Sequence, residues 1–513
     1  MRNSNLLKST VIVTIAMLLT RILGLIRESV LAGVYGAGSI TDAFITAFTL
    51  PNTILACIGS SIATVYVPLY HENKEDANRF TSNIINTTSL LGLCLTIVFF
   101  LFPSILVSLF ASGFDNETYK LATQFTRIMM LATIPILLFN VLKAYLQIFR
   151  AFFLATAIDG VINVLVIIGI VYSRISENLY IMIYGAVLGN VICLVCLFFS
   201  CRKHGFKYTL YINMNETRIK KMFFLILPIF IGIAVSELNT IIDRNFASSL
   251  ASGTVSAMNY ANKVNGILYS FLSTSVATVL YPELVKLAVE KNDGEIKRYI
   301  NKCILILTYI ILPLSALIFI LANPIIDFLF QRGSFSSEDT VITAECVQMY
   351  AIGYLTVNVN PVLNRVFYAY NDTKTPTINS IIAVTLNIIL NMLMIEKYKH
   401  MGLALSTSLA SILTTILLLF QLTKKMNGLE LKRVLKEILK IVFSCMMMSM
   451  LVYASQKYIF QFVTNTLTKF FALAVLTIMG LLTYIACSGL MGIKEVVEIR
   501  AIFIDRIRRW FRK

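Results

Sequence analysis

The chain has 513 residues, of which 57% are hydrophobic and only 14% are charged, and its mean hydropathy is +0.78. A soluble protein cannot bury so much apolar surface, whereas a lipid bilayer accepts it, so the composition indicates a protein that crosses a membrane many times. The formal net charge of +17 does not indicate a nucleic-acid-binding protein, because the basic residues lie in short segments between apolar runs.

Apolar windows of about twenty residues, separated by polar or Gly/Pro-marked segments, predict fourteen transmembrane helices and thus an all-α polytopic membrane protein. The first window is interpreted as a retained span rather than a signal peptide, because it continues past signal length and lacks a cleavage site at the right distance. The spans are expected near residues 10–33, 41–70, 82–111, 121–149, 152–173, 179–200, 219–246, 255–282, 300–330, 341–369, 376–395, 401–423, 437–459 and 467–490.

The basic residues predict the orientation of these spans. An even number of spans puts both termini on one side, and assigning that side to the cytoplasm places roughly thirty Lys and Arg residues in cytoplasmic segments against about seven in external ones. The strongest cytoplasmic segments are 202–221, 291–302, 424–440 and the tail ending RIRRWFRK. Only the external EKYKH segment at 396–400 is an exception to this rule.

The first two spans carry four ionisable residues at or near bilayer depth: Arg21, Arg27, Glu28 and Asp42. An ionisable side chain inside hydrocarbon costs roughly 2.5–3.5 kcal/mol on insertion scales, so it is retained where it faces protein or a wet cavity. The alternative is that the arginines extend to the membrane interface as anchors. The four residues predict a polar chamber inside the membrane that receives an anion.

Lys263, in the sequence NYANKVNGILYSF of the eighth span, is a further charge at such a depth. Three cations converging on one cleft suit a pyrophosphate or another multiply charged anion, because Arg binds phosphate oxygens bidentately and Lys acts as a point charge. We expect Asp42 to be the counter-charge that holds an arginine while the cleft is empty. The alternative is an internal ion-pair network that only stabilises packing.

Three strings of the first half recur in the second half at an offset of about 214 to 218 residues. They are SSIATVYVPLY (60–70) with TSVATVLYPELV (274–285), FPSILVSLFASGFDNETYKLATQ (102–124) with ANPIIDFLFQRGSFSSEDTVITAE (322–345), and IFRAFFLATAIDGVINVLVIIGI (148–170) with VFYAYNDTKTPTINSIIAVTLNIIL (366–390). Each unit of the repeat holds six spans, so the two copies share one orientation.

The repeat predicts two parallel six-helix lobes around a central cleft, with two extra C-terminal helices. The expected domains are an N-lobe at 1–201, a cytoplasmic linker at 202–218, a C-lobe at 219–423, two further helices at 424–490 and a basic cytoplasmic tail at 491–513. Like-oriented lobes that open first to one side and then to the other are typical of alternating-access transporters.

A second polar set comprises Asp243, Asn387, Asn391 and Thr407. One carboxylate with amide and hydroxyl oxygens suits a hard cation such as Na⁺. Against this, Arg244 follows Asp243 directly and could neutralise it, and polar residues also hold membrane helices together.

No GxxxxGK(S/T) motif occurs, and the three histidines lie in loops without metal-ligand spacing, so an ATP-binding P-loop and hydrolytic or metal catalysis are unsupported. We therefore expect a transporter rather than an enzyme, with no cofactor. Its energy would come from the membrane potential, an ion gradient such as Na⁺, or the substrate gradient, and moving one charge through 100 mV is worth about 2.3 kcal/mol.

The run LLTRILGLIRESVLAGVYGAGSITDAFITAFTLPN, followed by VYVPLY, LASGTVSAMNYANKV and NDTKTP, resembles the MurJ (MviN) lipid II flippases of the multidrug/oligosaccharidyl-lipid/polysaccharide exporter superfamily. The likeness extends over essentially the whole chain. It implies transfer of the undecaprenyl-pyrophosphate-linked peptidoglycan precursor, lipid II, from the inner to the outer leaflet of a bacterial cell membrane. We expect a multi-pass monomer among membrane lipids, with both termini cytoplasmic as the loop charges predict.

By this resemblance Arg21, Arg27 and Asp42 fall on functional positions of the family, and Lys263 stands where the family usually has an arginine. The family's Na⁺ site falls on the polar set that contains Asp243, and the last two helices are expected to form a groove for the polyprenyl tail. Several positions depart from the family pattern. Asn391 stands where a carboxylate occurs in at least one such site, and Leu55, Ala56, Ser60 and Ser61 replace paired arginines and a later Glu-Gly.

The sequence also admits other functions. The same cationic cleft would suit a flippase for another polyprenyl-pyrophosphate-linked oligosaccharide. A cation-coupled drug antiporter of the same superfamily should instead have acidic residues in its cleft. A scaffold for cell-wall enzymes that transports nothing would not need charges at bilayer depth.

Overall fold

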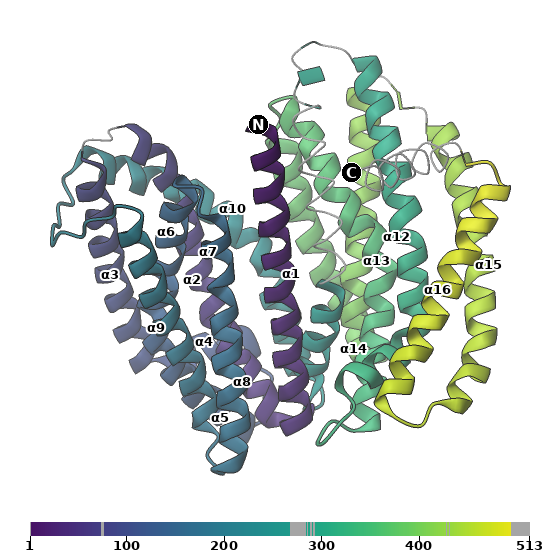
Figure 1. Cartoon of the computed structure of the whole chain (residues 1–513), viewed down its shortest axis with the longest axis horizontal. Coiled ribbons are helices and arrows are strands. Elements are labelled where there is room, and N and C mark those ends of the chain that lie inside the picture. The colour runs from purple at the N-terminus through teal and green to yellow at the C-terminus, as the bar shows by residue number, and fades with distance from the viewer. Residues whose placement is uncertain are drawn as a thin grey trace. The chain divides into compact units, whose positions relative to one another are not determined.

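The computed structural model describes residues 2–72, 76–266, 293–426, 428–429 and 431–493, with positions 284, 286, 287 and 290. Every regular element in these residues is a helix (Figure 1). Ten of the helical segments in this part of the chain are long and apolar enough to cross a membrane. The predicted class, an all-α polytopic membrane protein, is confirmed, whereas the count of fourteen spans and the repeat stay predictions.

The chain forms two compact units: the first comprises Met1–Asn259 and Arg332–Asp339, and the second comprises Tyr260–Gln331 and Thr340–Lys513. The helices of the first unit are α1 (Arg2–Tyr35), α2 (Ser39–Glu72), α3 (Ala77–Leu101), α4 (Pro103–Ala111), α5 (Asn116–Met129), η1 (Met130–Ala132), α6 (Thr133–Ile148), α7 (Phe152–Ala157), α8 (Asp159–Ile175), α9 (Tyr180–Lys203) and α10 (Thr217–Ser248).

The second unit holds α12 (Asp293–Phe330), most of α13 (Ser337–Ala369), α14 (Lys374–Lys425), α15 (Leu431–Ile459), η2 (Phe460–Phe462) and α16 (Thr466–Leu490). Residues 254–266 are also helical and cross from the first unit into the second. Three predicted segments lie mostly outside the described residues: the string 274–285, the tail 491–513 and the second half of the span 255–282.

Proline and backbone geometry explain where two predicted spans are interrupted. The span expected at 82–111 breaks into α3 and α4 at Phe102, because a residue before proline disfavours helical backbone and Pro103 suits the first turn of a new helix. The 52-residue α14 has non-helical backbone at Lys399 (φ 47°, ψ −127°), inside the EKYKH segment. This break separates the helices predicted at 376–395 and 401–423.

Aromatic side chains form the core where α2, α3, α6 and α9 meet. Tyr66, Phe80, Tyr145 and Phe206 are each at most 2% exposed. The ring centroids of Tyr66 and Phe80 lie 6.2 Å apart, and those of Tyr145 and Phe206 lie 5.4 Å apart. These contacts fix the end of α9 and the start of the following loop against α6.

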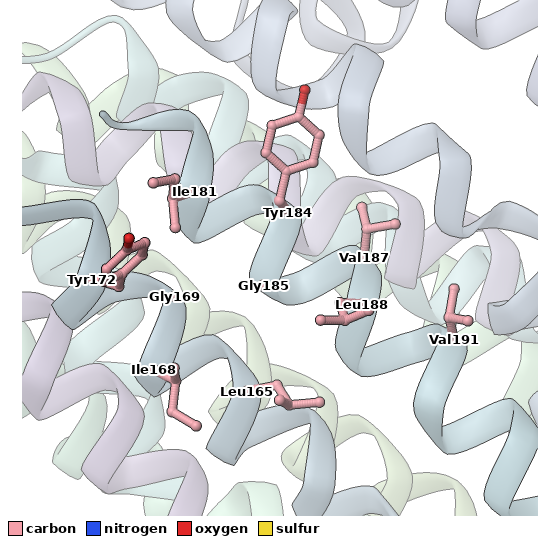
Figure 2. A pocket seen from close by; sticks show the side chains of 10 residues that line it. All are labelled: Leu165, Ile168, Gly169, Tyr172, Ile181, Tyr184, Gly185, Val187, Leu188 and Val191. Atoms are coloured by element: carbon pink, nitrogen blue, oxygen red, sulfur yellow. The ribbon is translucent and has the colours of Figure 1, made fainter. Parts of the chain in front are cut away.

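Small residues let α8 and α9 pack backbone to backbone. A Cβ atom on Gly185 would lie 3.1 Å from the Cα atom of Gly169 and 2.9 Å from the carbonyl oxygen of Leu165. This close approach is typical of helix pairs in membranes. Because Gly169 and Gly185 have no side chains, an apolar groove of about 420 Å³ lies between the two helices. Tyr172 and Tyr184 are among its lining residues (Figure 2).

Both halves of the predicted repeat contain the same helix-ending turn. Arg150 follows α6 with φ 59°, and the N–H group of Ala151 donates to the carbonyl of Leu146 at 2.9 Å. In the second half Asn371 has φ 58°, and the N–H group of Asp372 donates to the carbonyl of Phe367 at 2.9 Å. A 6→1 bond across a left-handed residue is the Schellman turn. The turn fits the pairing of strings 148–170 and 366–390.

Helix α10 packs on the first unit, although the repeat assigns it to the second half of the chain. The amide of Asn245 donates to the carbonyl of Leu109 at 3.2 Å, and the N–H group of Gly113 donates to the hydroxyl of Ser248 at 3.0 Å. The domain boundaries predicted from the repeat stay a prediction.

Helices α15 and α16 run side by side and pack on α12 within the second unit (Figure 1). The Nζ atom of Lys469 lies 2.7 Å from the carboxylate of Asp327, and the hydroxyl of Tyr484 donates to the carbonyl of Tyr309 at 2.8 Å. The predicted pair of extra C-terminal helices is therefore attached to the unit through α12.

Candidate functional site

Arg27 and Glu28 form a buried ion pair in the second half of α1, with side-chain exposures of 8% and 3%. A charge is retained inside a membrane protein only when its partners replace water. The guanidinium of Arg27 also donates to Oδ1 of Asn163 at 3.0 Å, and its Cζ atom lies 4.5 Å from the ring centroid of Phe48. Contacts from α2 and α8 thus hold this arginine inside the protein rather than at the lipid interface.

Asn163 belongs to a series of polar contacts that α1 makes with α7 and α8. The hydroxyl of Tyr35 lies 2.7 Å from the hydroxyl of Ser173, and the hydroxyl of Thr20 donates to the carbonyl of Thr156 at 3.5 Å. These contacts lie on both sides of the Arg27 contact along α1. They fix the register that places the Asn163 amide beside the guanidinium.

Glu28 connects α1 to the helix at 254–266. One of its oxygens pairs with Arg27, and the other accepts a hydrogen bond from the amide of Asn259 at 3.3 Å. Asn259 is itself 8% exposed. The carboxylate is therefore the shared partner of a guanidinium and an amide in the interior of the first unit.

Asp42 lies in the first turn of α2 and is 2% exposed. Its two carboxylate oxygens accept hydrogen bonds from the backbone N–H groups of Gly253 and Ser256, each at 2.7 Å. A carboxylate at a helix N-terminus satisfies donors that have no partner within the helix and interacts favourably with the helix dipole. We expected Asp42 to pair with an arginine, but Glu28 is the partner of Arg27, and Asp42 caps the helix at 254–266.

Glycine turns bring this end of the first unit together. Gly253 has φ 92°, and a Cβ atom on it would lie 2.7 Å from the carbonyl oxygen of Ala37. The N–H group of Ser334 donates to the carbonyl of Gly33 at 2.9 Å, and the hydroxyls of Ser39 and Ser252 lie 2.9 Å apart. Beside them is a polar cavity of about 180 Å³ that Asp42 helps to line.

Arg21 and Lys263 are both exposed. Arg21 precedes Glu28 by seven residues and therefore lies on the same face of α1. Lys263 belongs to the second unit, where the neighbouring Asn262 donates to the hydroxyl of Tyr350 at 3.3 Å. Convergence of these two cations with Arg27 on one anion stays a prediction.

The polar set predicted to bind a cation is divided between the two units. Asp243 is half-buried in α10 of the first unit. In the second unit the amide of Asn391 donates to Oδ1 of Asn387 at 3.1 Å, and the amide of Asn387 donates to the hydroxyl of Thr407 at 3.3 Å. Two oxygens that a cation would require are thus used by hydrogen bonds among the three neutral side chains, an arrangement that also holds two helices together.

Sequence reasoning did not select Phe48, Asn163, Asn259, Gly253 or Ser256. Asn163 carried a usable signal, because it is an amide within a predicted apolar span, where polar groups need a partner. Gly253 and Ser256 contribute through their backbone N–H groups. Every residue except proline has such a group, so residue type does not identify these two positions. Leu55, where the resembled family often has an arginine, is buried in the apolar core at 1% exposure.

Comparisons with known proteins agree with this architecture. A family model described as "Lipid II flippase MurJ" matches residues 31–484. A protein of Rickettsia prowazekii named "Probable lipid II flippase MurJ" is 27% identical over 472 residues, which cover 89% of this chain and 92% of the relative. The "Lipid II flippase MurJ" of Thermosipho africanus is 28% identical over 493 residues, which cover 95% of this chain and 97% of the relative.

Among solved structures, a "Lipid II flippase MurJ, inward closed conformation" matches with a TM-score of 0.80 at 27% identity, covering 94% of this chain and 99% of that chain. A "multidrug resistance MATE family transporter of the MOP superfamily" in an inward-facing conformation matches with a TM-score of 0.66 at 15% identity, covering 82% of this chain and 99% of that chain, and so shares the fold. The family match, the curated relatives and the first of these structures extend over most of the sequence. The chain therefore belongs to the lipid II flippase MurJ family.

Proposed function

We propose that this protein transfers lipid II from the inner to the outer leaflet of a bacterial cell membrane by alternating access, and that Arg27 binds the diphosphate of the substrate. The observation that carries the proposal is the burial of the Arg27 guanidinium in the second half of α1, paired with Glu28. The names of the curated relatives support the choice of substrate.

The geometry around Arg27 suits binding of a diphosphate. Asn163 and Phe48 orient the guanidinium and would continue to do so after Glu28 is displaced. A guanidinium with little competing water binds phosphate oxygens bidentately and more strongly than it would in bulk solvent. Glu28 neutralises the arginine in the empty protein, and the substrate replaces it. Arg21 and Lys263 are proposed as further cationic contacts.

Alternating access requires contacts that form in one state and break in the other. Glu28 and Asp42 each connect the first two helices to residues 253–259 through hydrogen bonds of 2.7 to 3.3 Å. We propose that these bonds close the external side and that they exchange for water when that side opens. Solved transporters of the same fold are described in both inward-facing and outward-facing conformations.

The membrane potential is proposed as the energy source. A diphosphate headgroup carries negative charge from a negative cytoplasm outward, and each elementary charge moved through 100 mV is worth about 2.3 kcal/mol. The neutral set Asn387, Asn391 and Thr407 favours Na⁺ less, because the oxygens of Asn387 and Thr407 already accept hydrogen bonds within the set. The alternative is coupling to Na⁺, in which case the rate of transfer would depend on Na⁺ at constant potential.

A drug antiporter is the second candidate of the same fold, and the buried arginine speaks against it. A site for cationic drugs requires unpaired acidic groups. In the first unit both oxygens of Asp42 already accept hydrogen bonds from backbone N–H groups, and Glu28 already pairs with Arg27.

Replacing Arg27 in cells depleted of their own lipid II flippase tests the proposed function. We expect Arg27→Ala to insert normally and to leave lipid II inaccessible at the outer leaflet, whereas Arg27→Lys retains part of the transfer because it keeps the charge and loses the bidentate geometry. Arg298→Ala, at a site where the side chain is 83% exposed, is the matched control and should transfer like the parent. Full transfer by a stably inserted Arg27→Ala protein would refute the proposal.

A further inference from the structure

The loop between α9 and α10 is held along the first turns of α3 by side chains rather than by a sheet or a helix. Asn83 accepts from the N–H group of Asn213 at 2.9 Å and donates to the carbonyl of Asn213 at 3.0 Å. Asn86 donates to the carbonyl of Tyr211 at 3.0 Å. Residues 207–216 are called the strap below. The hydrogen bonds from Asn83 and Asn86 satisfy backbone groups of the strap and fix which of its side chains point away from α3.

The strap runs toward the membrane-spanning part of α3 and then returns. It begins beside Asn78, which accepts from the N–H group of Lys207 at 3.3 Å, and it reaches Asn86 at Tyr211. It then turns back to Asn83 at Asn213. The residues around Tyr211 are therefore the apex of the strap, the part that lies farthest along α3.

The apex lies where the lipid-facing surface of α3 begins. Leu90 and Leu91 are 45% and 39% exposed, and they follow Asn86 by about one helical turn, or roughly 6 Å. Leu210 and Ile212, which flank the apex, are 86% and 54% exposed. An almost fully exposed leucine beside an exposed isoleucine at this level continues the apolar surface that α3 presents to lipid.

Exposure alternates in the middle of the strap, from Leu210 to Met214. Met214 is also exposed, at 45%, so apolar side chains point outward at positions 210, 212 and 214, whereas the hydroxyl of Tyr208 donates to Oδ1 of Asn86 at 2.6 Å. Between them Tyr211 faces α3, where the guanidinium of Arg79 lies 4.0 Å from its ring centroid. A period of two gives an extended segment one outer and one inner face. The outer face of the strap is apolar.

Basic side chains flank this apolar face in the chain. Exposed cations precede and follow it: Arg202, Lys203, Lys207, Lys220 and Lys221. The strap itself contains a single acidic residue, Glu216, whose carboxylate is paired with Arg218 at 2.7 Å. Exposed apolar side chains bordered by cations favour the surface of a membrane that contains anionic lipids.

We propose that the strap is a membrane-surface anchor: Leu210 and Ile212 enter the boundary between headgroups and acyl chains of the cytoplasmic leaflet, and the flanking lysines contact anionic headgroups. The leaflet follows from the distribution of basic residues, which assigns this loop to the cytoplasm. The anchor goes beyond transport itself, because it holds the connection between the two halves of the chain at the lipid surface.

Tryptophan fluorescence tests the anchor in the full-length protein. The chain has one tryptophan, Trp510, so Trp510→Phe provides a background into which Leu210→Trp is introduced. In vesicles of phosphatidylethanolamine and phosphatidylglycerol, we expect lipids brominated on the acyl chain to remove at least about half of the emission of this probe, as for a side chain buried 5–10 Å deep. Asn215→Trp in the same background is the control and should be quenched less, because Asn215 is exposed and follows the point at which the strap has turned back to Asn83.

Emission from position 210 that stays at a water-exposed wavelength and is not quenched would overturn the proposal, and would leave the apolar face as a contact for a soluble protein. The lipid charge is tested separately with Leu210→Asp. In detergent this variant should melt like the parent, because Leu210 is exposed. Added phosphatidylglycerol should then raise the melting temperature of the parent more than that of the variant. An equal rise in both proteins would contradict the anchor.

Discussion

At the residue scale, Asp42 shows how a carboxylate is stabilised inside a membrane protein without a cation. Its oxygens accept the N–H groups of Gly253 and Ser256 at 2.7 Å, donors that belong to the start of a helix and have no partner within it. Asp42 therefore joins the start of α2 to two residues that lie 211 and 214 positions later in the chain.

Removing this carboxylate should loosen the first unit in a graded way. Asp42→Ala leaves two buried N–H groups unsatisfied, which costs about 1–3 kcal/mol for each group. Asp42→Asn keeps one acceptor oxygen, so its melting temperature in detergent should lie between those of the alanine variant and the parent. Glu338→Ala, at an exposed position of the same unit, controls for loss of charge. Equal melting temperatures for parent and Asp42→Ala would show that the cap contributes nothing.

At the element scale, α5 begins with an N-cap that titrates. Oδ1 of Asp115 accepts from the N–H group of Thr118 at 2.7 Å, and this backbone hydrogen bond holds the pKa of Asp115 below its ordinary value. Because the folded pKa is lowered, the stabilisation is fully present above the ordinary aspartate pKa and is lost as the pH falls through the folded pKa.

We therefore expect the parent to lose stability on acidification from pH 5 to pH 3 by more than Asp115→Asn does, because asparagine keeps the cap without titrating. At neutral pH Asp115→Ala should cost about 1 kcal/mol and Asp115→Asn less. Thermal melting in detergent across this pH range is the measurement. Identical pH profiles for parent and Asp115→Asn would contradict the assignment.

The sequence predicted many elements but few of their contacts, and the reason is physical. Hydropathy and proline report local properties, so the windows near 41–70 and 179–200 correspond to α2 and α9, and the EKYKH segment marks the break at Lys399. The pairing of Glu28 with Asn259 depends on residues more than two hundred positions apart. Neither residue type nor spacing encodes such a contact. Charge at membrane depth still indicated that Arg27 and Glu28 needed partners.

At the scale of the whole molecule, recurring strings predict a duplicated chain, whereas contacts define the two units. Helix α10 belongs to the second copy by sequence and packs on the first unit through Asn245 and Ser248. These hydrogen bonds are made to backbone groups at the end of α4 and in the loop that follows it. They depend on how distant segments meet, which a repeat does not specify.

The energy source is a property of the whole molecule and can be measured in vesicles. We expect transfer of lipid II to slow when the potential is collapsed with valinomycin and potassium, because the headgroup then gains no free energy in moving outward. Replacing Na⁺ with choline at constant potential should leave the rate unchanged. A rate that follows Na⁺ and ignores the potential would instead assign the coupling to the set Asp243, Asn387, Asn391 and Thr407.

The most direct test of the account is the affinity of the purified protein for lipid II, measured for the parent, Arg27→Lys and Arg27→Ala in the same detergent. Loss of a charge-assisted bidentate contact, worth about 1.5–3 kcal/mol, should weaken binding by at least about tenfold in the alanine variant and less in the lysine variant. Equal affinity of the parent and a correctly folded Arg27→Ala protein would contradict the claim that this buried guanidinium binds the diphosphate.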